Sequence, residues 1–429
     1  MAQLNLQRNS EVFFSTVDII NSATADSMTP ANTWKLEVLA GFAVTSAAAT
    51  QDITSLESGL SPDRSQARFN TAINPVDWNF QTYLRPTGVQ VKAAHNTTTA
   101  ATNTTGNVKP IADWFMWQAL TSSTTVAAKR QTYVAEVGES STWVNEGKLV
   151  TTTQAGAQYV HASASNFAIA PEYHIYFKLD NVVYQVSNAT VNQATVDAGI
   201  EEIAATTWAG FGTTLREITG VNRDNAIAVF GGVNNFGTSI TANSSAATLT
   251  QKHSYHPYNL MNVAGSIATN SFIKNRLSAI EFHHKATAGG SDEKFTFPVT
   301  SLSFDYNNNI TYLTPEELSS LNEPIGQFAG TRAVTGSASM YLRTGELESA
   351  GFLRNIQNDS RTTSAQTSNA NLIVGGSVAP YIAFQLDACQ FEFPTLATED
   401  VISMTVNFVG QEPTASRGDG GEVKIFAAK

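Results

Sequence analysis

The sequence predicts a mainly β protein built from two tandem β-sandwich or barrel domains, each with a short flanking α-helix, plus loop insertions. Three observations lead to this fold class: short runs in which apolar and polar residues alternate, turn-forming residues between these runs, and internal similarity between the two halves. In residues 402–408 every second side chain is apolar, and Ser, Thr and Asn stand between them. Alternation with a period of two is typical of a strand with one buried face.

Further strands are expected where similar runs are bounded by Gly, Asn, Asp or Pro, as at 34–38 and 301–304. Two short helices are also expected. One follows Pro110, because proline is favoured in the first turn of a helix. The other spans the apolar residues that recur every three positions from Leu347 to Ile356, with acidic residues at its start.

The internal similarity consists of four short blocks that occur in the same order in both halves. They pair 53–54 with 310–311, 83–85 with 341–343, 175–180 with 382–387, and 208–210 with 408–410. In the third pair the apolar positions also change parity after the Asp, which indicates a bulge or a tight turn at 180–181 and at 387–388. Strands share Tyr, Leu and Thr by general preference, so coincidence is the alternative to duplication.

We expect the apolar residues of these blocks to form the cores of two related domains. They are Tyr83, Ile175, Phe177, Leu179 and Trp208 in the first copy and Tyr341, Ile382, Phe384, Leu386 and Phe408 in the second. The expected organisation is a first β domain at 1–220 with an insertion around 94–172, a connector at 221–269, a second β domain at 270–412 and a C-terminal tail at 413–429.

The composition excludes several classes of protein. Only 14% of the 429 residues are charged, and 25 Lys and Arg against 36 Asp and Glu give a formal net charge of −11. An acidic chain is a poor candidate for a nucleic-acid binder with a basic surface. No apolar run is long enough for a membrane-spanning helix, so no membrane partner is expected. A polar surface with few charges suits contact with other copies, because burying charge is unfavourable.

No motif for catalysis, a cofactor or a metal emerges, so we expect a protein that is not an enzyme and has no cofactor. The clustered histidines, His253 with His256 and His283 with His284, lack a third ligand at a recognisable spacing. The single cysteine, Cys389, excludes an internal disulfide framework. It occupies an alternating apolar position, which favours a packing role over that of a nucleophile.

Two long connections between expected strands are candidate assembly interfaces, with a purely structural loop as the alternative. Long connections are often functional, and aromatic and Arg residues are enriched at protein interfaces. The candidates are Arg64, Arg68, Phe69 and Asn70 in the first half and Pro315, Pro324, Gly326 and Arg332 in the second.

Several of these segments resemble bacteriophage tail tube proteins, also called major tail proteins. The segments are Ser65 to Pro86, 175–184, 207–212, 275–278, 307–310 and 334–337. Together they touch both copies. The resemblance implies a β-sandwich with a flanking helix, whose inner strands join those of neighbouring subunits into one barrel. It also implies a long loop that bridges subunits or stacked rings.

For a chain with two copies of such a domain, the resemblance implies a trimer with pseudo-hexagonal symmetry, with a hexamer as the alternative. The implied role is a structural subunit of the virion tail, assembled in the host cytoplasm into stacked rings around a channel for DNA. Its implied partners are other copies of itself and the sheath, tape-measure, baseplate and terminator proteins. DNA would be only transient, non-specific cargo, since an acidic wall repels it. Another tail protein, such as a terminator, baseplate or decoration protein, remains an alternative, as does a β-rich carbohydrate-binding module.

Overall fold

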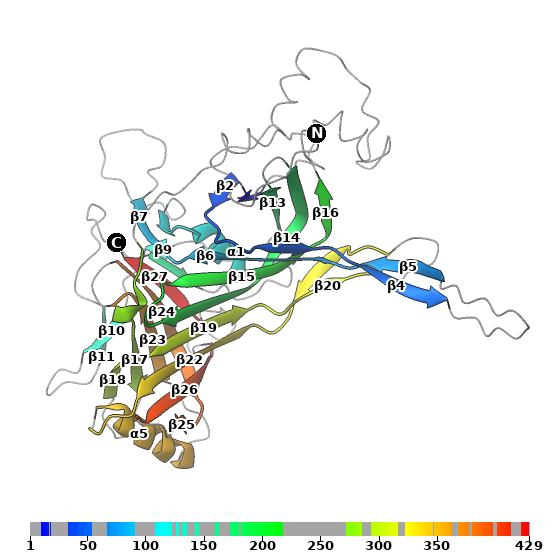
Figure 1. The fold of residues 1–429 in the computed structure, drawn as a ribbon. Helices are drawn as coiled ribbons and strands as arrows, with labels where there is room; N and C mark the ends of the chain where they lie inside the picture. The colour runs from blue at the N-terminus through cyan, green and yellow to red at the C-terminus, as the bar shows by residue number, and fades with distance from the viewer. Residues whose placement is uncertain are drawn as a thin grey trace, which may run out of the picture.

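A computed structural model shows a chain of strands with two α-helices among the residues that it describes (Figure 1). The described residues are 10–16, 18, 33–53, 67–90, 108–121, 126–127, 131–134, 142–145, 159–162, 172–179, 182–217, 272–284, 293–315, 322–345, 347–362, 368–376, 380–397, 401–412 and 422–428. The predicted mainly β class is confirmed. Within these ranges, no helix combines the length and the apolar character needed to cross a membrane.

The first part of the chain forms an antiparallel sheet with the strand order β2-β1-β13-β14-β16. Its strands are β1 (Ser10–Ser15), β2 (Thr33–Leu36), β13 (Tyr173–Leu179), β14 (Val182–Gly199) and β16 (Thr214–Glu217). Residues 12–14 of β1 and 175–177 of β13 are fully buried, including neighbours that point to opposite faces. Both faces of this sheet are therefore covered at its centre.

The C-terminal part forms a sheet with the corresponding order β18-β17-β23-β24-β27, again antiparallel throughout. Its strands are β17 (Ala279–His284), β18 (Glu293–Pro298), β23 (Ser368–Val374), β24 (Tyr381–Phe391) and β27 (Lys424–Ala428). Residues 280, 282, 382 and 384 are apolar and fully buried. The core of this sheet is thus built from the same alternation as that of the first.

A longer sheet connects the two parts, and we call it the long sheet. Its order is β3-β6-β15-β14-β19-β22-β26, followed by β25 and the end of β24. The new strands are β3 (Ala43–Thr45), β6 (Val76–Tyr83), β15 (Ala205–Gly212), β19 (Ser301–Asn307), β22 (Ala333–Tyr341), β25 (Thr395–Ala397) and β26 (Ser403–Gly410). Figure 1 shows β19, β22 and β26 lying side by side. β14 belongs to both sheets, since its first half pairs with β13 and its second half with β15 and β19.

Two sets of strands therefore follow each other and pair in the same order. By pairing, β1, β2, β3, β6, β13, β14, β15 and β16 correspond to β17, β18, β19, β22, β23, β24, β26 and β27. One helix lies in the same place in each set, between β6 and β13 or between β22 and β23.

This pairing corrects two of the block alignments made from the sequence. Gly210, opposite Trp78, takes the place of Phe408, opposite Gly336, so the block at 208–210 is displaced by two residues from 408–410. The block at 175–180 lies in β13, whereas the block at 382–387 lies in β24, which corresponds to β14. The blocks look alike because both are buried strands with the same alternation. The parity change also takes two forms. Leu179 of β13 pairs directly with Val182 of β14, whereas β24 continues past a register shift against β23.

Most of the predicted core residues of the two halves are buried. Ile175, Phe177, Trp208, Ile382, Phe384, Leu386 and Phe408 are at most 1% exposed. Three are corrections: Tyr83 and Leu179 are half-buried, and Tyr341 is 48% exposed. Tyr83 and Tyr341 end their strands directly after a core-facing residue, so the alternation points them to the opposite face.

Both expected helices are present. α1 (Trp114–Thr121) begins four residues after Pro110, which itself lies in strand β8 (Val108–Ile111). Its Trp117 ring lies 4.8 Å from Trp208 and 5.6 Å from Phe384, so α1 contacts strands of both halves. α5 (Ser349–Thr362) holds Phe352, which stacks on Phe282 at 4.7 Å.

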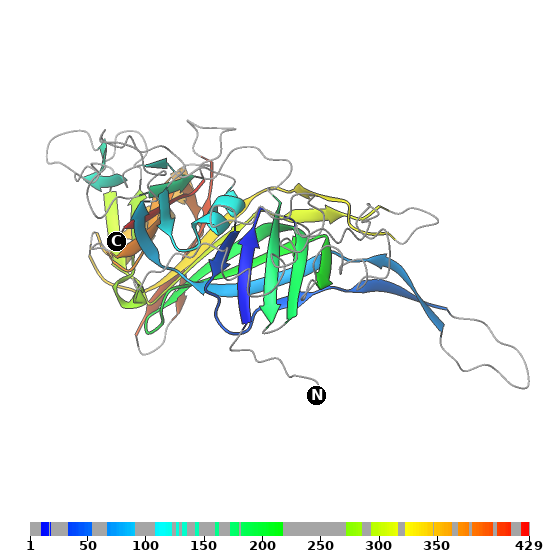
Figure 2. The ribbon, with the colours of Figure 1, turned by 90° about the horizontal axis from the view of Figure 1, so that it is seen from above.

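Two hairpins, which we call the arms, continue the long sheet beyond the body. They consist of β4 (Ala48–Ile53) with β5 (Ala67–Ile73), and of β20 (Ile310–Leu313) with β21 (Gly326–Ala329). Figures 1 and 2 show both arms leaving the body on the same side, with β4 and β5 reaching farthest. The arms also touch each other, because the Ile73 N–H donates to the Asn322 carbonyl at 2.8 Å.

The remaining strands come mostly from the predicted insertion. They are β7 (Pro86–Gln90), β8, β9 (Val126–Ala127), β10 (Gln131–Val134), β11 (Thr142–Asn145) and β12 (Tyr159–Ala162). β27 pairs with β12 on one side and with β24 on the other, so residues 424–428 are a strand of the fold, which corrects the predicted tail. Ile425 and Ala427 bury alternate positions there. The predicted connector at 221–269 lies outside the described residues.

Candidate assembly surfaces

The two faces of the long sheet have opposite chemistry. One face packs into the core, as in β6, where Val76, Trp78, Phe80 and Thr82 are buried and the residues between them are not. The other face is polar. Its polar residues are Asp77, Asn79, Gln81, Gln193, Thr195, Asp197, Thr207, Ser303, Asp305, Asn307, Thr335, Ser337, Ser339, Thr405 and Asn407, and the apolar residues Ala205, Ala209, Phe211 and Val409 lie among them. We call it the polar face.

The polar face holds acids and no cations. The sequences of β3, β6, β15, β19, β22, β25 and β26, and residues 190–199 of β14, contain no Lys or Arg. They contain Asp77, Asp197 and Asp305, and Glu392 lies beside them just after β24. A surface with carboxylates and no ammonium or guanidinium groups repels a polyanion and gives its phosphates no cationic partner.

Side-chain hydrogen bonds hold the two halves together where β14 meets β19, which we call the internal joint. Asp305 Oδ1 accepts hydrogen bonds from Gln193 Nε2 at 2.7 Å and from Thr195 Oγ1 at 2.6 Å. Ser303 Oγ donates to Asp197 Oδ1 at 2.7 Å. Each carboxylate is thus bound by neutral donors from the other strand. Together with seven backbone pairs, these bonds make the joint specific for one register.

Two glycines let aromatic rings lie flat over neighbouring strands of the long sheet. Gly210 stands opposite Trp78, and a Cβ there would lie 2.3 Å from the Trp78 ring and 2.0 Å from the Thr190 carbonyl oxygen. Gly336 stands opposite Phe408, whose ring would lie 2.3 Å from such a Cβ. Glycine is required where another group approaches the backbone this closely.

The first arm carries three of the predicted interface residues. Arg68 and Asp52 form an exposed two-bond ion pair, with Nε to Oδ1 at 2.5 Å and Nη2 to Oδ2 at 3.2 Å. Phe69 is 48% exposed and Asn70 is exposed. Arg64 lies outside the described residues. This segment is a strand of a hairpin, where the sequence indicated a loop, because its partner strand could not be identified from spacing.

The second arm places its predicted residues less uniformly. Pro324 is buried, and Pro315 and Gly326 are half-buried. Arg332 lies at the base of the arm, where its Nη1 is 2.7 Å from Glu422 Oε2 and its guanidinium lies over the Tyr306 ring. Its charge is therefore used within the chain, and we do not include it in an assembly surface.

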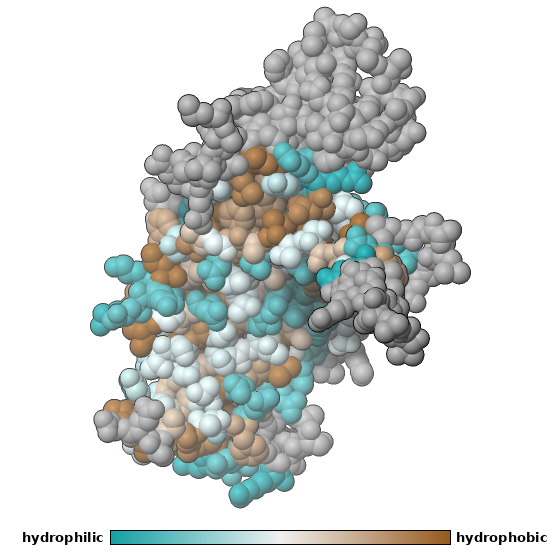
Figure 3. Space-filling model, turned by 45° about the vertical axis from the view of Figure 1, so that its right-hand side comes forward, coloured by the Kyte–Doolittle hydropathy of each residue, from teal (hydrophilic) through white to brown (hydrophobic). Residues whose placement is uncertain are grey.

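The exposed side chains of the second arm that sequence reasoning missed are apolar. Leu313, Ile325 and Phe328 are each more than half exposed. A two-stranded ribbon has no second layer to cover its apolar residues, so alternation alone does not bury them. Figure 3 shows one face of the molecule, where hydrophobic residues reach the surface in separate patches among polar ones. Patches of this kind are typical of contact sites.

A buried polar cluster ties α1 to the long sheet. Trp208 Nε1 donates to Thr82 Oγ1 at 2.9 Å, and Thr82 Oγ1 donates to Asp113 Oδ2 at 2.6 Å. The Asp113 carbonyl accepts the first helical N–H groups of α1, from Met116 and Trp117. Burial raises the pKa of Asp113 to about 6, against the opposing effects of the Thr82 hydrogen bond and the Arg85 charge. No feature of the sequence pointed to this cluster.

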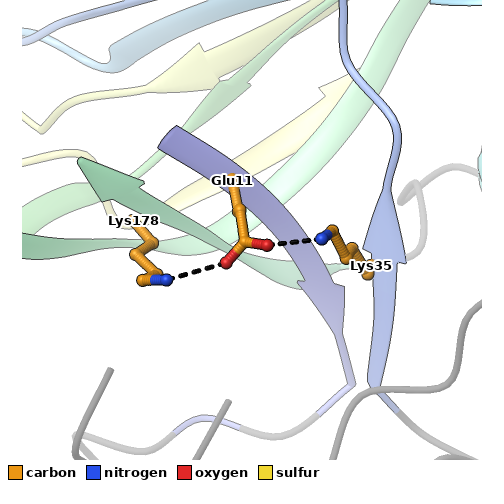
Figure 4. A network of polar contacts seen from close by, with 3 residues as sticks. All are labelled: Glu11, Lys35 and Lys178. Atoms are coloured by element: carbon orange, nitrogen blue, oxygen red, sulfur yellow. Dashed lines mark hydrogen bonds and ion pairs between the residues drawn. The ribbon is translucent and has the colours of Figure 1, made fainter. Parts of the chain in front are cut away.

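A second polar network joins three strands of the first sheet (Figure 4). Glu11 of β1 lies between Lys35 of β2 and Lys178 of β13, and the Lys178 Nζ to Glu11 Oε2 distance is 2.8 Å. Burial acts to raise the pKa of Glu11, but the hydrogen bonds and charges of the two lysines outweigh it, so the pKa is lowered. This network stabilises strand pairing and is remote from the polar face.

Within the described ranges, no three His, Cys, Asp or Glu side chains stand close enough to hold a metal ion. Cys389 is fully buried, in keeping with the predicted packing role, and His283 is buried in β17. His253 and His256 lie outside the described residues. The described residues therefore present surfaces and sheet edges as the candidate sites.

Comparison with known proteins points in the same direction. No protein-family model matches the chain. The chain is 25% identical to "Tail tube protein pb6" of Escherichia phage T5, over an alignment that covers 97% of this chain and 75% of that protein. The resemblance to phage tail tube proteins that the sequence predicted is confirmed by this relationship.

Proposed function

We propose that the chain is a structural subunit of a phage tail tube, whose copies form stacked rings around a channel for DNA. The observation that supports this most is the long sheet. One of its faces is buried, and the other is polar, acidic and without cations. A tube wall requires a polar face on its inner side, and a sheet this wide without Lys or Arg in its strands suits a wall that DNA passes.

The repeated strand order supports two copies of a tube domain in one chain. The long sheet contains β3-β6-β15-β14 and then β19-β22-β26-β24, which correspond strand by strand. Three chains would then supply six such units, which gives a trimer with pseudo-hexagonal symmetry. A ring formed in this way closes the sheet into a barrel and removes its open edges.

The polar face supplies the wall of the channel in this proposal. Asp77, Asp197, Asp305 and Glu392 would be repeated around the ring, and no Lys or Arg of the long sheet would stand among them. Binding of DNA relies on cations that neutralise its phosphates. DNA would therefore pass as cargo without being retained, and the protein would act in the virion tail as a structural part and not as an enzyme.

The arms are the proposed contacts between stacked rings or neighbouring subunits. They leave the body on one side (Figures 1 and 2). They expose Phe69, Leu313, Ile325 and Phe328. Exposed apolar residues on a projecting ribbon are stabilised when a second protein surface covers them. Sheath, tape-measure, baseplate and terminator proteins remain proposed neighbours of the finished tube.

Electron microscopy of the purified full-length chain tests this proposal. We expect hollow tubes or rings at high protein concentration, and mass measurement of isolated rings is expected to give three chains per ring. Rings of six chains would contradict the trimer but retain the tube. A protein that stays monomeric at high concentration across a range of salt concentrations would contradict the tube itself.

A further inference from the structure

The long sheet ends in two open edges within the part of the chain that the structure describes. β3 pairs only with β6, and β25 pairs only with β26. The corresponding edges in the middle of the sheet are joined, because β14 pairs with β19 at the internal joint. An open strand edge is a template for another strand. The internal joint therefore supplies a template for a joint between two chains.

The register of a joint between two chains can be derived by aligning the two halves. Residues that pair with one another across neighbouring strands form a row, and each row is located by its distance from the Tyr that ends β6 or β22. Thr195 of β14 lies in one row with Thr207 and Gln81, and Gln81 is two residues before Tyr83, the end of β6. In the other half, Thr395 lies in one row with Thr405 and Ser339, and Ser339 is two residues before Tyr341, the end of β22. Thr395 therefore occupies the position of Thr195.

The opposite side of the joint is aligned in the same way. Asp305 of β19 pairs with Thr335, which is six residues before Tyr341. Thr45 of β3 pairs with Asp77, which is six residues before Tyr83. Thr45 therefore occupies the position of Asp305. Since Thr195 pairs with Asp305 inside the chain, Thr395 is expected to pair with Thr45 between chains.

The carboxylate lies on β19 in the internal joint, but on the β24–β25 edge in the joint between chains. Inside the chain, Gln193 and Thr195 donate to Asp305. In the other half, Glu392 occupies the position of Gln193. It lies opposite Asn407, and its N–H donates to the Asn407 carbonyl at 2.9 Å. Its carboxylate accepts from Asn407 Nδ2 at 3.0 Å and is exposed. On the β3 side, Asp77 already stands beside Thr45, so a second acid there would meet a like charge.

We propose that the β24–β25 edge of one chain pairs with β3 of a second copy, with Thr395 opposite Thr45 and with Glu392 as the residue that determines partner choice. This inference rests on the proposed ring function. In this joint the Glu392 carboxylate accepts a hydrogen bond from the Thr45 hydroxyl of β3. If the same edge paired instead with β19 of a chain whose internal joint is open, Glu392 would meet the carboxylate of Asp305. Placing like charges opposite each other disfavours that exchange. The joint would also cover Phe393 and Leu396, which are 60% and 45% exposed.

A charge-reversal series tests this register. Thr45→Glu places a second carboxylate diagonally beside Glu392, where Asp305 stands beside Gln193 in the internal joint, and we expect the concentration needed for ring formation to rise at least about tenfold. Adding Glu392→Gln to the same chain is expected to restore assembly. Gln81→Glu is the matched control, because it makes the same charge change on the polar face away from the open edges, and it is expected to assemble like the wild type.

Two further measurements separate the alternatives. Thermal melting of each variant before assembly confirms that it is folded. The double variant Thr45→Glu with Asp77→Asn removes the repulsion within the chain and is expected to remain defective. The proposed register is overturned if Thr45→Glu assembles as well as the wild type, or if Glu392→Gln does not relieve its defect. Either result leaves the tube function standing. Failure of the wild type itself to form rings overturns the tube function and this inference with it.

Discussion

The two halves of the chain share a strand order but differ in how each helix is fixed to the sheet. In the first half, Thr82 and Asp113 form a buried polar cluster with Trp208. In the second half, the residue that matches Thr82, directly before the terminal Tyr, is Met340, and Phe352 of α5 packs among phenylalanines. The same topology therefore tolerates a polar or an apolar residue at one position, and in the polar cluster Trp208 Nε1 and Thr82 Oγ1 each have an acceptor.

The difference predicts unequal responses to mutation and pH. An apolar contact is lost in proportion to the volume removed, whatever the pH. A buried carboxyl changes its charge within the accessible pH range. Substitutions at matched positions of the two halves test this contrast.

Phe352→Ala is expected to have the largest effect. Its ring contacts those of Phe282, Phe295, Phe297 and Phe391, so truncation leaves a cavity in a fully packed site. The free energy of unfolding should fall by about 3–5 kcal/mol, as measured by denaturant titration. Arg354→Ala, at an exposed position of α5, is the control and should be close to neutral. A similarly small effect for both would show that α5 does not support the second half.

Asp113→Asn tests the polar solution in the first half. The folded-state pKa of about 6 lies above the ordinary value of 3.8, so the folded protein holds this proton more tightly than the unfolded chain does. Its contribution to stability is fully present below about pH 4 and is lost as the pH rises through about 6. Over that range the wild type should lose about 3 kcal/mol relative to the Asn variant. Parallel pH profiles of the two proteins would contradict a protonated Asp113.

The two glycines opposite aromatic rings compare the halves at matched sites. Gly336→Ala and Gly210→Ala should each lower the free energy of unfolding by about 1–3 kcal/mol through overpacking. Gly210→Ala should have the larger effect, because its Cβ would lie 2.0 Å from the Thr190 carbonyl oxygen, whereas a Cβ at Gly336 would lie 2.9 Å from the Ser303 carbonyl oxygen. Gly326→Ala is the control, since nothing lies within 4 Å of its added Cβ. The reverse order in thermal melting would mean that the Trp78 side adjusts more easily than the Phe408 side.

Substitution of the two arginines of the arms should change stability in one case and leave it unchanged in the other. Arg332→Gln removes the ion pair with Glu422 in a mostly buried site, and stability should fall by about 1–3 kcal/mol. Arg68→Gln removes an exposed ion pair, and the melting temperature of the unassembled chain should not change measurably. A large loss of stability from Arg68→Gln would show that the first arm is a structural part of the body.

The sequence predicted local features well and distant pairings poorly. The run at 402–408 became β26, and both helices were expected near their positions, because alternation and helical spacing are written in consecutive residues. The strand at 424–428 was missed, since it is short and acquires its place only by pairing with β12 and β24. The arms were predicted as loops for the same reason: a ribbon is defined by its partner strand.

Among the candidate surface residues too, those marked by local sequence were predicted, and those that depend on distant pairings were missed. Phe69 was identified because an exposed aromatic in a polar segment is visible in the sequence. The role of Glu392 could not be inferred, because it depends on aligning rows across strands that are far apart in the chain. Arg332 illustrates the converse, since its partner Glu422 is 90 residues away and no spacing rule links the two.

The sharing of β14 between two sheets also sets the order of events during synthesis. Its last residues cannot pair with β19 until residue 307 has been made, 108 positions after Gly199. At translation rates of about 5–20 residues per second, that edge stays open on the nascent chain for roughly 5–20 seconds. During this interval the first half presents an unpaired strand edge to other nascent chains nearby. The low charge of the chain then gives little electrostatic protection against aggregation.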